Sequence, residues 1–203
     1  MRCLFCDKEI EKYSLKSILL EEDSICCDCR DLLKVDRKIE KIGDLKIETF
    51  FEYEGIYRSL LIQYKECYDE ALKDVFIYDI KDYIKLKYYG YQILYVPSSE
   101  AKIKERGFNH LELMFDSLHF KKVTGLRSKK ELIQEGKSGL VRKQMIDNYL
   151  YGGPRLNKVL IVDDMLTTGS SITGVYNTIV PYSNKIKCLV LASKRKTLSH
   201  LKY

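Results

Sequence analysis

The sequence lacks tryptophan and has little proline, but it is rich in tyrosine. Its 203 residues include three prolines, 16 tyrosines and seven phenylalanines, so that aromatic side chains make up 11% of the chain. This share argues against intrinsic disorder, because disordered chains are poor in aromatic residues. A chain of this length can bury roughly 70% of the surface that it exposes when unfolded, so one domain with a small module needs no disulfide for stability.

The sequence also lacks any run of about 20 apolar residues, the length that a membrane-spanning helix requires. The N-terminus, Met1-Arg2-Cys3, is followed closely by Asp7 and Glu9, which is unlike a secretory signal peptide. The number of cysteines is seven, and an odd number does not suit a complete set of disulfides. We therefore expect a cytoplasmic protein in a reducing compartment, without membrane insertion.

Acidic side chains are scarce in the second half of the chain. Residues 1–95 contain 16 Lys and Arg against 20 Asp and Glu, whereas residues 96–203 contain 19 against 9. The most basic stretch, from Lys121 to Lys143, has eight cations and two acids. This half is expected to attract polyanions, either phosphorylated metabolites or nucleic acid. A solvated Lys-rich surface would give the same composition, and charge alone favours that interpretation.

Four of the cysteines form two pairs with two-residue spacing, Cys3 with Cys6 and Cys26 with Cys29. Two such pairs can supply four thiolates to a tetrahedral Zn²⁺ ion, and four thiolates leave no open position for water. The spacing therefore predicts a structural zinc site. A pairing shifted through Cys27 stays open. Disulfides and a thioredoxin-like redox pair are disfavoured by the reducing compartment and by the lack of a strand before Cys3.

Residues 34–46 alternate in charge and contain Gly43, a pattern typical of a linker or an exposed turn. We therefore divide the chain into residues 1–44, a zinc-binding knuckle with its linker, and residues 45–203, a larger domain. The remaining cysteines, Cys67 and Cys188, lie among apolar residues and are expected to be buried.

Short apolar strands alternate with amphipathic helices in the larger domain. We expect strands at residues 47–53, 92–96, 159–162 and 186–192, and helices within 56–86 (broken near 67–69), 108–118 and 170–180 (ended by Pro181). This alternation predicts an α/β fold with a mainly parallel sheet flanked by helices on both faces.

The most informative segment runs from Val159 to Ser171. An apolar strand is followed by Asp163 and Asp164, and then by a loop of small residues that opens a helix: Thr167, Thr168, Gly169, Ser170 and Ser171. Gly169 allows close approach of the backbone to an anion, and the hydroxyl groups with the free N–H groups of the helix can cradle a phosphate. The carboxylates suit ribose hydroxyls or a Mg²⁺ ion that carries pyrophosphate.

A diol beside a phosphate is the chemistry of a 5-phosphoribosyl group, so the segment predicts a ribose-phosphate site. The alternative is a strand that ends in acids before an N-capped helix. The segment has no Lys of the Walker A type, which argues against an ATP-hydrolysing P-loop. The pattern over residues 159–171 resembles the signature of the type I phosphoribosyltransferases.

The whole chain resembles the competence protein F family (ComFC/GntX type), in which a four-cysteine zinc knuckle precedes a phosphoribosyltransferase-like domain. Besides the knuckle and the phosphate loop, three segments are similar to family motifs: Tyr53-Glu54-Gly55 leading to Lys65, Tyr95-Val96-Pro97 leading to Arg106-Gly107-Phe108-Asn109, and Gln134 leading to Arg142. His110 stands where the family usually has Gln.

The resemblance implies phosphoribosyl pyrophosphate (PRPP) with Mg²⁺ as ligand. Asp163 and Asp164 would hold its ribose and metal side, and the loop from Thr167 to Ser171 its 5-phosphate. The turn Val96-Pro97-Ser98-Ser99 would be the pyrophosphate loop, which makes Pro97 and Ser98 candidate binding residues. Arg106 would face the anion or stabilise this loop. Asp163, Asp164 and Arg106 are therefore also the candidate catalytic residues.

The resemblance implies a cytoplasmic competence factor that handles single-stranded DNA during natural transformation, with another competence protein as partner. A phosphoribosyltransferase with an unidentified acceptor is the alternative, and a nucleotide-responsive scaffold that docks a partner through the knuckle is a third. The basic stretch from Lys121 to Lys143 would serve as a lid over the site or as a contact to nucleic acid, because Lys and Arg suit both.

Overall fold

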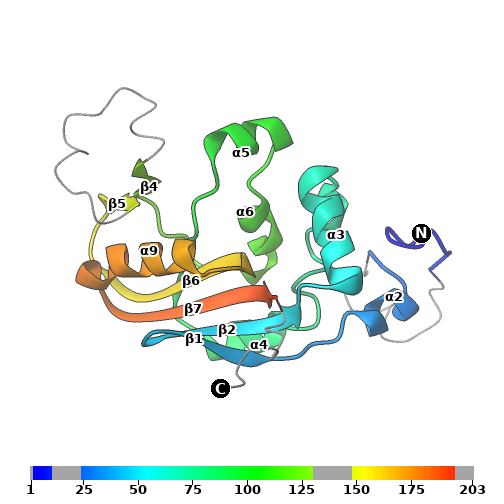
Figure 1. The fold of residues 1–203 in the computed structure, drawn as a ribbon, viewed down its shortest axis with the longest axis horizontal. Coiled ribbons are helices and arrows are strands. Elements are labelled where there is room, and N and C mark those ends of the chain that lie inside the picture. The colour runs from blue at the N-terminus through cyan, green and yellow to red at the C-terminus, as the bar shows by residue number, and fades with distance from the viewer. Residues whose placement is uncertain (1, 11–23, 130–147, 195–203) are drawn as a thin grey trace, which may run out of the picture.

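The computed structural model describes residues 2–10, 24–129 and 148–194, and its centre is a five-stranded sheet (Figure 1). The strands lie in the order β1 (Lys38–Ile42), β2 (Leu45–Glu52), β7 (Ser183–Ser193), β6 (Leu156–Leu166) and β3 (Gln92–Tyr95). β2, β7, β6 and β3 run parallel, and only β1 pairs antiparallel. The predicted α/β fold with a mainly parallel sheet is confirmed.

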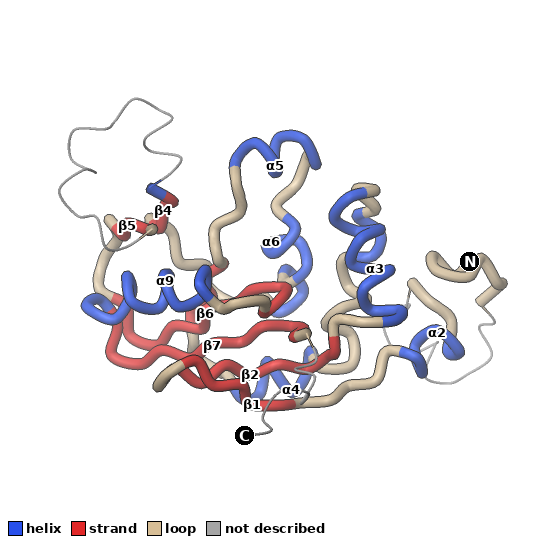
Figure 2. Tube along the Cα trace, in the orientation of Figure 1, coloured by secondary structure: helices blue, strands red, loops and turns tan. Residues whose placement is uncertain are grey.

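The sheet is covered on both faces, as its apolar strands require. The side chains from Val159 to Val162 on β6 are fully buried, so neither face of this strand meets water. Helix α9 (Ser170–Ile179) lies over one face, and α4 (Lys81–Lys87) lies below the other (Figures 1 and 2). Because Pro181 lacks an N–H group, α9 passes at its end into a short 3-10 turn.

The other elements precede the sheet in the chain or connect its strands. They are the helices α2 (Cys27–Leu32), α3 (Gly55–Glu66), α5 (Glu100–Arg106) and α6 (His110–Met114), the 3-10 turns η1 (Glu70–Leu72), η2 (Asp116–Leu118) and η3 (Val180–Tyr182), and the hairpin strands β4 (Leu126–Ser128) and β5 (Tyr149–Tyr151). Within the described ranges, no helix has the length and apolar character needed to cross a membrane.

Several boundaries differ from the sequence-based expectations. Residues 38–42 form the edge strand β1 and pair with β2 across a turn at Gly43, where a linker or exposed turn was expected. β6 continues beyond Val162 to Leu166 and so includes both acidic residues. Cys67 is exposed because it follows the last turn of α3, whereas Cys188 is buried as expected. The domain boundary after residue 44 stays a prediction.

The predicted helical region 56–86 is broken at the expected place. Helix α3 ends at Glu66, and Tyr68 takes a left-handed conformation with φ of 60°. The second helix is shorter than expected, because residues 73–80 form turns before α4 begins at Lys81. Residues 130–143 of the basic stretch, with Gln134 and Arg142, lie outside the described residues.

One buried carboxylate joins β2 to α4. The side chain of Glu48 on β2 is only 3% exposed. Its oxygens accept hydrogen bonds from Lys87 Nζ at 2.8 Å and Tyr83 Oη at 2.7 Å, and also from Arg37 and Tyr88. Burial alone would raise the pKa of Glu48, but these donors outweigh burial and lower it to about 2. Glu48 is therefore ionised and fully paired at neutral pH.

We expect Glu48→Gln to lower the free energy of unfolding by ~2 kcal/mol, because the amide NH₂ cannot accept from the surrounding donors and leaves some of them unpaired. Glu66→Gln, at an exposed position, is the control and should change stability by less than about 0.5 kcal/mol. Urea unfolding of both variants measures the difference, and equal stabilities would contradict the role of Glu48.

The pH dependence of stability follows from the same carboxylate. The pKa of Glu48 is lower in the folded protein than its ordinary value of 4.5. Its stabilisation is therefore complete above about pH 4.5 and is lost as the pH falls through about 2. This part of the acid sensitivity should be absent in Glu48→Gln.

Candidate functional site

The structure brings the four predicted metal ligands together. The Sγ atoms of Cys3, Cys6, Cys26 and Cys29 all lie within 4.8 Å of one another. A tetrahedral ion with metal–sulfur bonds of about 2.3 Å requires sulfur atoms about 3.8 Å apart, so the cluster has the size of a metal site. Cys27 lies outside the cluster and is exposed, which removes the shifted pairing.

The surroundings of Cys3 lower the pKa of its thiol. Burial alone would raise the pKa of Cys3, but backbone N–H groups of Cys6, Cys26 and Phe5 donate hydrogen bonds to its sulfur. These bonds favour the thiolate and lower the pKa of Cys3 to about 6. The thiolate is the form that binds metal ions.

Both halves of the cysteine cluster are anchored to the larger domain. Gln63 Nε2 on α3 donates to the carbonyl oxygen of Leu4, between the first two cysteines, at 3.1 Å. Arg30, directly after Cys29, donates through Nη1 to the carbonyl oxygen of Val75 at 2.7 Å and pairs with Asp79 at 3.3 Å. The knuckle is therefore docked on α3 and on the turns that follow it.

The two predicted acidic residues are consecutive residues near the carboxyl end of β6. Because adjacent side chains of a strand point to opposite faces, Asp163 and Asp164 are separated by the sheet. Asp164 is 5% exposed and lies on the face that α3 and α6 cover, where its Oδ2 accepts from Lys65 Nζ at 2.5 Å. Asp163 is half-buried and lies on the face of α9, and its Oδ1 accepts from the backbone N–H of Asp164 at 2.9 Å.

The environment shifts the pKa values of the two carboxyls apart. Burial would raise the pKa of Asp164, but His110 and Lys65 together hold it well below its usual range. Burial, together with the negative charge of Asp164, raises the pKa of Asp163. Asp164 is therefore the permanent anion of the pair, and a cation placed beside Asp163 would favour its ionised form.

The predicted phosphate loop opens α9 on the same face as Asp163. The side chains of its hydroxyl residues, Thr167, Thr168, Ser170 and Ser171, are exposed. Thr168 Oγ1 lies 3.0 Å from Ser170 Oγ. The N–H of Thr173 donates to the carbonyl oxygen of Gly169 at 2.9 Å, and the N–H of Ser170 donates to Thr168 Oγ1 at 3.4 Å. The start of a helix with exposed hydroxyl groups around it is a place where an anion can bind.

Gly169 is required at this turn for two reasons. Its φ of 75° lies in the left-handed region that favours glycine. A Cβ atom at this position would also lie 1.9 Å from Cδ1 of Ile42 on β1. From the sequence, the expected role of Gly169 is to let an anion approach the backbone closely. The structure adds a second role, because the absence of a side chain lets the loop pack against β1.

The turn after β3 lies beside β6, as the neighbouring parallel strands require. Val96 N donates to Val162 O at 3.0 Å and extends the pairing of β3 with β6 by one residue. Pro97 and Ser98 are half-buried, and the side chain of Ser99 caps α5 by accepting from Lys102 N at 3.2 Å. The carboxyl ends of adjacent parallel strands are the usual place of a ligand site in such sheets.

Arg106, a candidate catalytic residue, is only 7% exposed. Its Nε donates to the carbonyl oxygen of Lys65 at 2.8 Å, and its Nη1 lies 3.0 Å from Nδ1 of His110. The imidazole of His110 also lies near Asp164 and Ser98. The structure thus brings Arg106, Asp164 and Ser98 together around one side chain. The sequence analysis gave His110 no role, although this residue directly follows the Arg-Gly-Phe-Asn segment and stands where the family usually has Gln.

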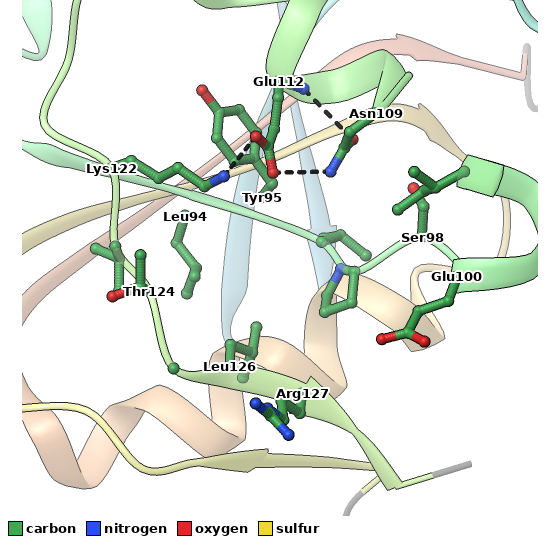
Figure 3. A pocket seen from close by; sticks show the side chains of 15 residues that line it. Leu94, Tyr95, Ser98, Glu100, Asn109, Glu112, Lys122, Thr124, Leu126 and Arg127 are labelled. Carbon is green, nitrogen blue, oxygen red and sulfur yellow. Dashed lines mark hydrogen bonds and ion pairs between the residues drawn. The ribbon is translucent and has the colours of Figure 1, made fainter. Parts of the chain in front are cut away.

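A pocket of about 390 Å³ lies on the outer side of β3. Pro97 and Ser98 line it together with Glu100 and Arg127, so it adjoins the predicted pyrophosphate loop (Figure 3). At one end, the carboxylate of Glu112 accepts from Asn109 Nδ2 at 2.9 Å and pairs with Lys122. The two acidic residues of β6 and the phosphate loop do not line this pocket.

Fold and site together define an α/β protein with an N-terminal module that can hold one metal ion. No family model matches the chain. The chain is 26% identical over 208 residues to the competence protein ComFC of Streptococcus pneumoniae, in an alignment that covers 86% of this chain and 91% of that protein. The predicted resemblance to the competence protein F family is confirmed over most of the chain.

We expect the purified protein to contain about one metal ion per chain, held by the four clustered cysteines. Cys26→Ser should abolish this metal content, because serine does not replace a buried thiolate ligand. Cys27→Ser is the matched control and should retain the metal, since Cys27 lies outside the cluster. Elemental analysis without added metal measures the content, and loss of metal in both variants, or in neither, would refute the assignment.

Proposed function

We propose that this protein is a cytoplasmic competence factor that handles single-stranded DNA during natural transformation and binds PRPP with Mg²⁺. The similarity to the competence protein ComFC over 86% of the chain carries this proposal. In the same proposal the four-cysteine cluster holds a structural Zn²⁺ ion, because four thiolates form a closed tetrahedral shell.

The geometry at the end of β6 supports a ribose-phosphate ligand. The hydroxyl loop and the first turn of α9 suit a phosphate, and Asp163 lies on the same face, where no cation of the described residues pairs with its carboxyl. Mg²⁺, when bound, neutralises charge on the pyrophosphate, and carboxylate oxygens are its preferred protein ligands. Two cations lie at this end of β6, because Lys65 pairs with Asp164 and Arg106 donates to the backbone carbonyl of Lys65.

The phosphate loop offers the cleanest test of PRPP binding. A double variant of Thr168→Val and Ser170→Ala removes two exposed hydroxyl groups and should weaken binding by about tenfold or more, since each lost hydrogen bond contributes ~1 kcal/mol. Asn177→Ala, exposed near the other end of α9, should bind as the wild type does. Calorimetry with PRPP and Mg²⁺ measures both, and undiminished binding by the double variant would refute the site.

Exposed cations support the contact to single-stranded DNA. Lys102 and Lys104 lie exposed on α5, the helix that directly follows the predicted pyrophosphate loop (Figure 1). Each phosphate that a cation neutralises contributes about 0.7 to the slope of log affinity against log salt for single strands. Another competence protein is a further partner in this proposal.

We expect the affinity for single-stranded DNA to fall steeply with salt. Lys102→Ala with Lys104→Ala should reduce the slope by about 1.4, the share of two phosphate contacts. Lys41→Ala with Lys46→Ala removes two exposed cations of the β1–β2 hairpin and should leave the slope unchanged. Fluorescence anisotropy with a labelled oligonucleotide measures the slopes, and a slope near zero in the wild type would exclude DNA handling.

The pocket beside Pro97 and Ser98 favours one alternative, an active phosphoribosyltransferase with an unidentified acceptor. Its volume of about 390 Å³ falls within the range of small-molecule sites. In that reaction the bond from ribose C1 to pyrophosphate breaks and a bond to the acceptor forms. Release of pyrophosphate on adding a nucleobase or another candidate acceptor would support this alternative over a binding role for PRPP.

A further inference from the structure

We propose that His110 is the positioning residue of the candidate site, which holds Arg106, Asp164 and Ser98 in one arrangement. Three side chains from three different segments converge on its imidazole ring. Arg106 Nη1 lies 3.0 Å and Ser98 Oγ 3.4 Å from Nδ1, while Asp164 Oδ2 lies 3.6 Å from Nε2. All three neighbours are candidate site residues of the sequence analysis.

The neighbours of the ring determine its protonation. A guanidinium group can only donate hydrogen bonds, so Nδ1 must accept from Arg106 and carries no proton. The proton of the neutral ring is therefore on Nε2 and points toward the carboxylate of Asp164. Burial favours this neutral ring and lowers the pKa of His110, and the charges of Lys65 and Arg106 act in the same direction, while Asp164 opposes them.

The backbone of His110 is held in place as well. His110 is 5% exposed, and Tyr64 Oη on α3 donates to its carbonyl oxygen at 2.8 Å. Its Nε2 has no hydrogen-bond partner within the described part of the chain, because the 3.6 Å to Asp164 exceeds a normal hydrogen bond. This buried N–H group, directed at the anion of the site, is the observation that a purely apolar packing role leaves unexplained.

The contacts of His110 close a ring of four residues. Arg106 donates to the carbonyl of Lys65, Lys65 donates to Asp164, Asp164 faces Nε2 of His110, and Nδ1 of His110 faces Arg106. Each member comes from a different helix or strand: α3, β6, α5 and α6. Removal of the imidazole leaves Arg106 with a buried donor group that has no acceptor, and Asp164 without its second polar neighbour.

Two substitutions separate a polar role from a steric one. Glutamine offers both an acceptor oxygen for Arg106 and a donor NH₂ for Asp164, whereas leucine fills similar space with neither. PRPP binding with Mg²⁺, measured by calorimetry, should stay within about threefold of the wild type in His110→Gln and fall by about tenfold or more in His110→Leu. Equal binding by wild type and His110→Leu, or equal loss in both variants, would overturn the proposal.

Nitrogen-15 NMR of the wild-type protein tests the same inference without any ligand. The sequence contains three histidines, so the signals of His110 are identified by their absence in His110→Gln. We expect a neutral ring protonated on Nε2, and we expect the Nε–H of Arg106 to exchange slowly with water in wild type and His110→Gln. A ring protonated on Nδ1 would overturn the proposal even where His110→Leu fails to fold.

The binding measurement rests on the proposed function, but the NMR measurement does not. If wild-type protein fails to bind PRPP while His110 is protonated on Nε2 and the Arg106 Nε–H exchanges slowly, then the proposed ligand is wrong and the positioning role of His110 stands. If PRPP binds but Nδ1 carries the proton, then the ligand stands and the role of His110 is wrong.

Discussion

The buried ring of Lys65, Asp164, His110 and Arg106 is the constraint on which the candidate site depends. It brings the side chains of Lys65 and Arg106 close to the buried carboxylate of Asp164, in surroundings where an unpaired charge would be costly. Each charged group is satisfied only while the other members keep their places, so α3, α5, α6 and β6 must meet at one point. Ser98, in the turn after β3, lies next to this ring through its contact with His110.

Helix α3 links this ring to the cysteine cluster. Gln63 binds the backbone of Leu4 within the knuckle, and Lys65, two residues later, binds Asp164. A short rigid helix end therefore contacts both the metal-binding module and the acidic site.

The sequence predicted those features that depend on local patterns. The apolar runs at Ile93 and Val159 marked buried parallel strands, and the cysteine spacing marked the cluster, because each pattern is contained in a few neighbouring residues. β1 was missed because an edge strand between Lys38 and Ile42 exposes most of its side chains, and its alternating charge is equally typical of a loop.

The role of His110 could not be predicted in the same way. Its partners are Ser98, Arg106 and Asp164, and the last of them is remote in sequence and reaches the ring only because β6 lies next to the turn after β3. Polar contacts of this kind depend on which faces of separate elements meet, and periodicity within one element does not report that. Candidate site residues could therefore be proposed from the sequence, but the contacts between them could not.

The adjacent acids of β6 show how one motif can serve two purposes. A strand directs neighbouring side chains to opposite faces, so Asp163 and Asp164 cannot both face the same ligand unless the backbone turns at this point. Asp164 already compensates the charge of Lys65, and its removal would leave that half-buried cation without its carboxylate partner. Asp163 pairs with no cation among the described residues, and it lies on the same face of the sheet as the phosphate loop. The pair is thus best understood as one structural carboxylate and one carboxylate available to a ligand, and a variant of both residues would confuse loss of folding with loss of binding.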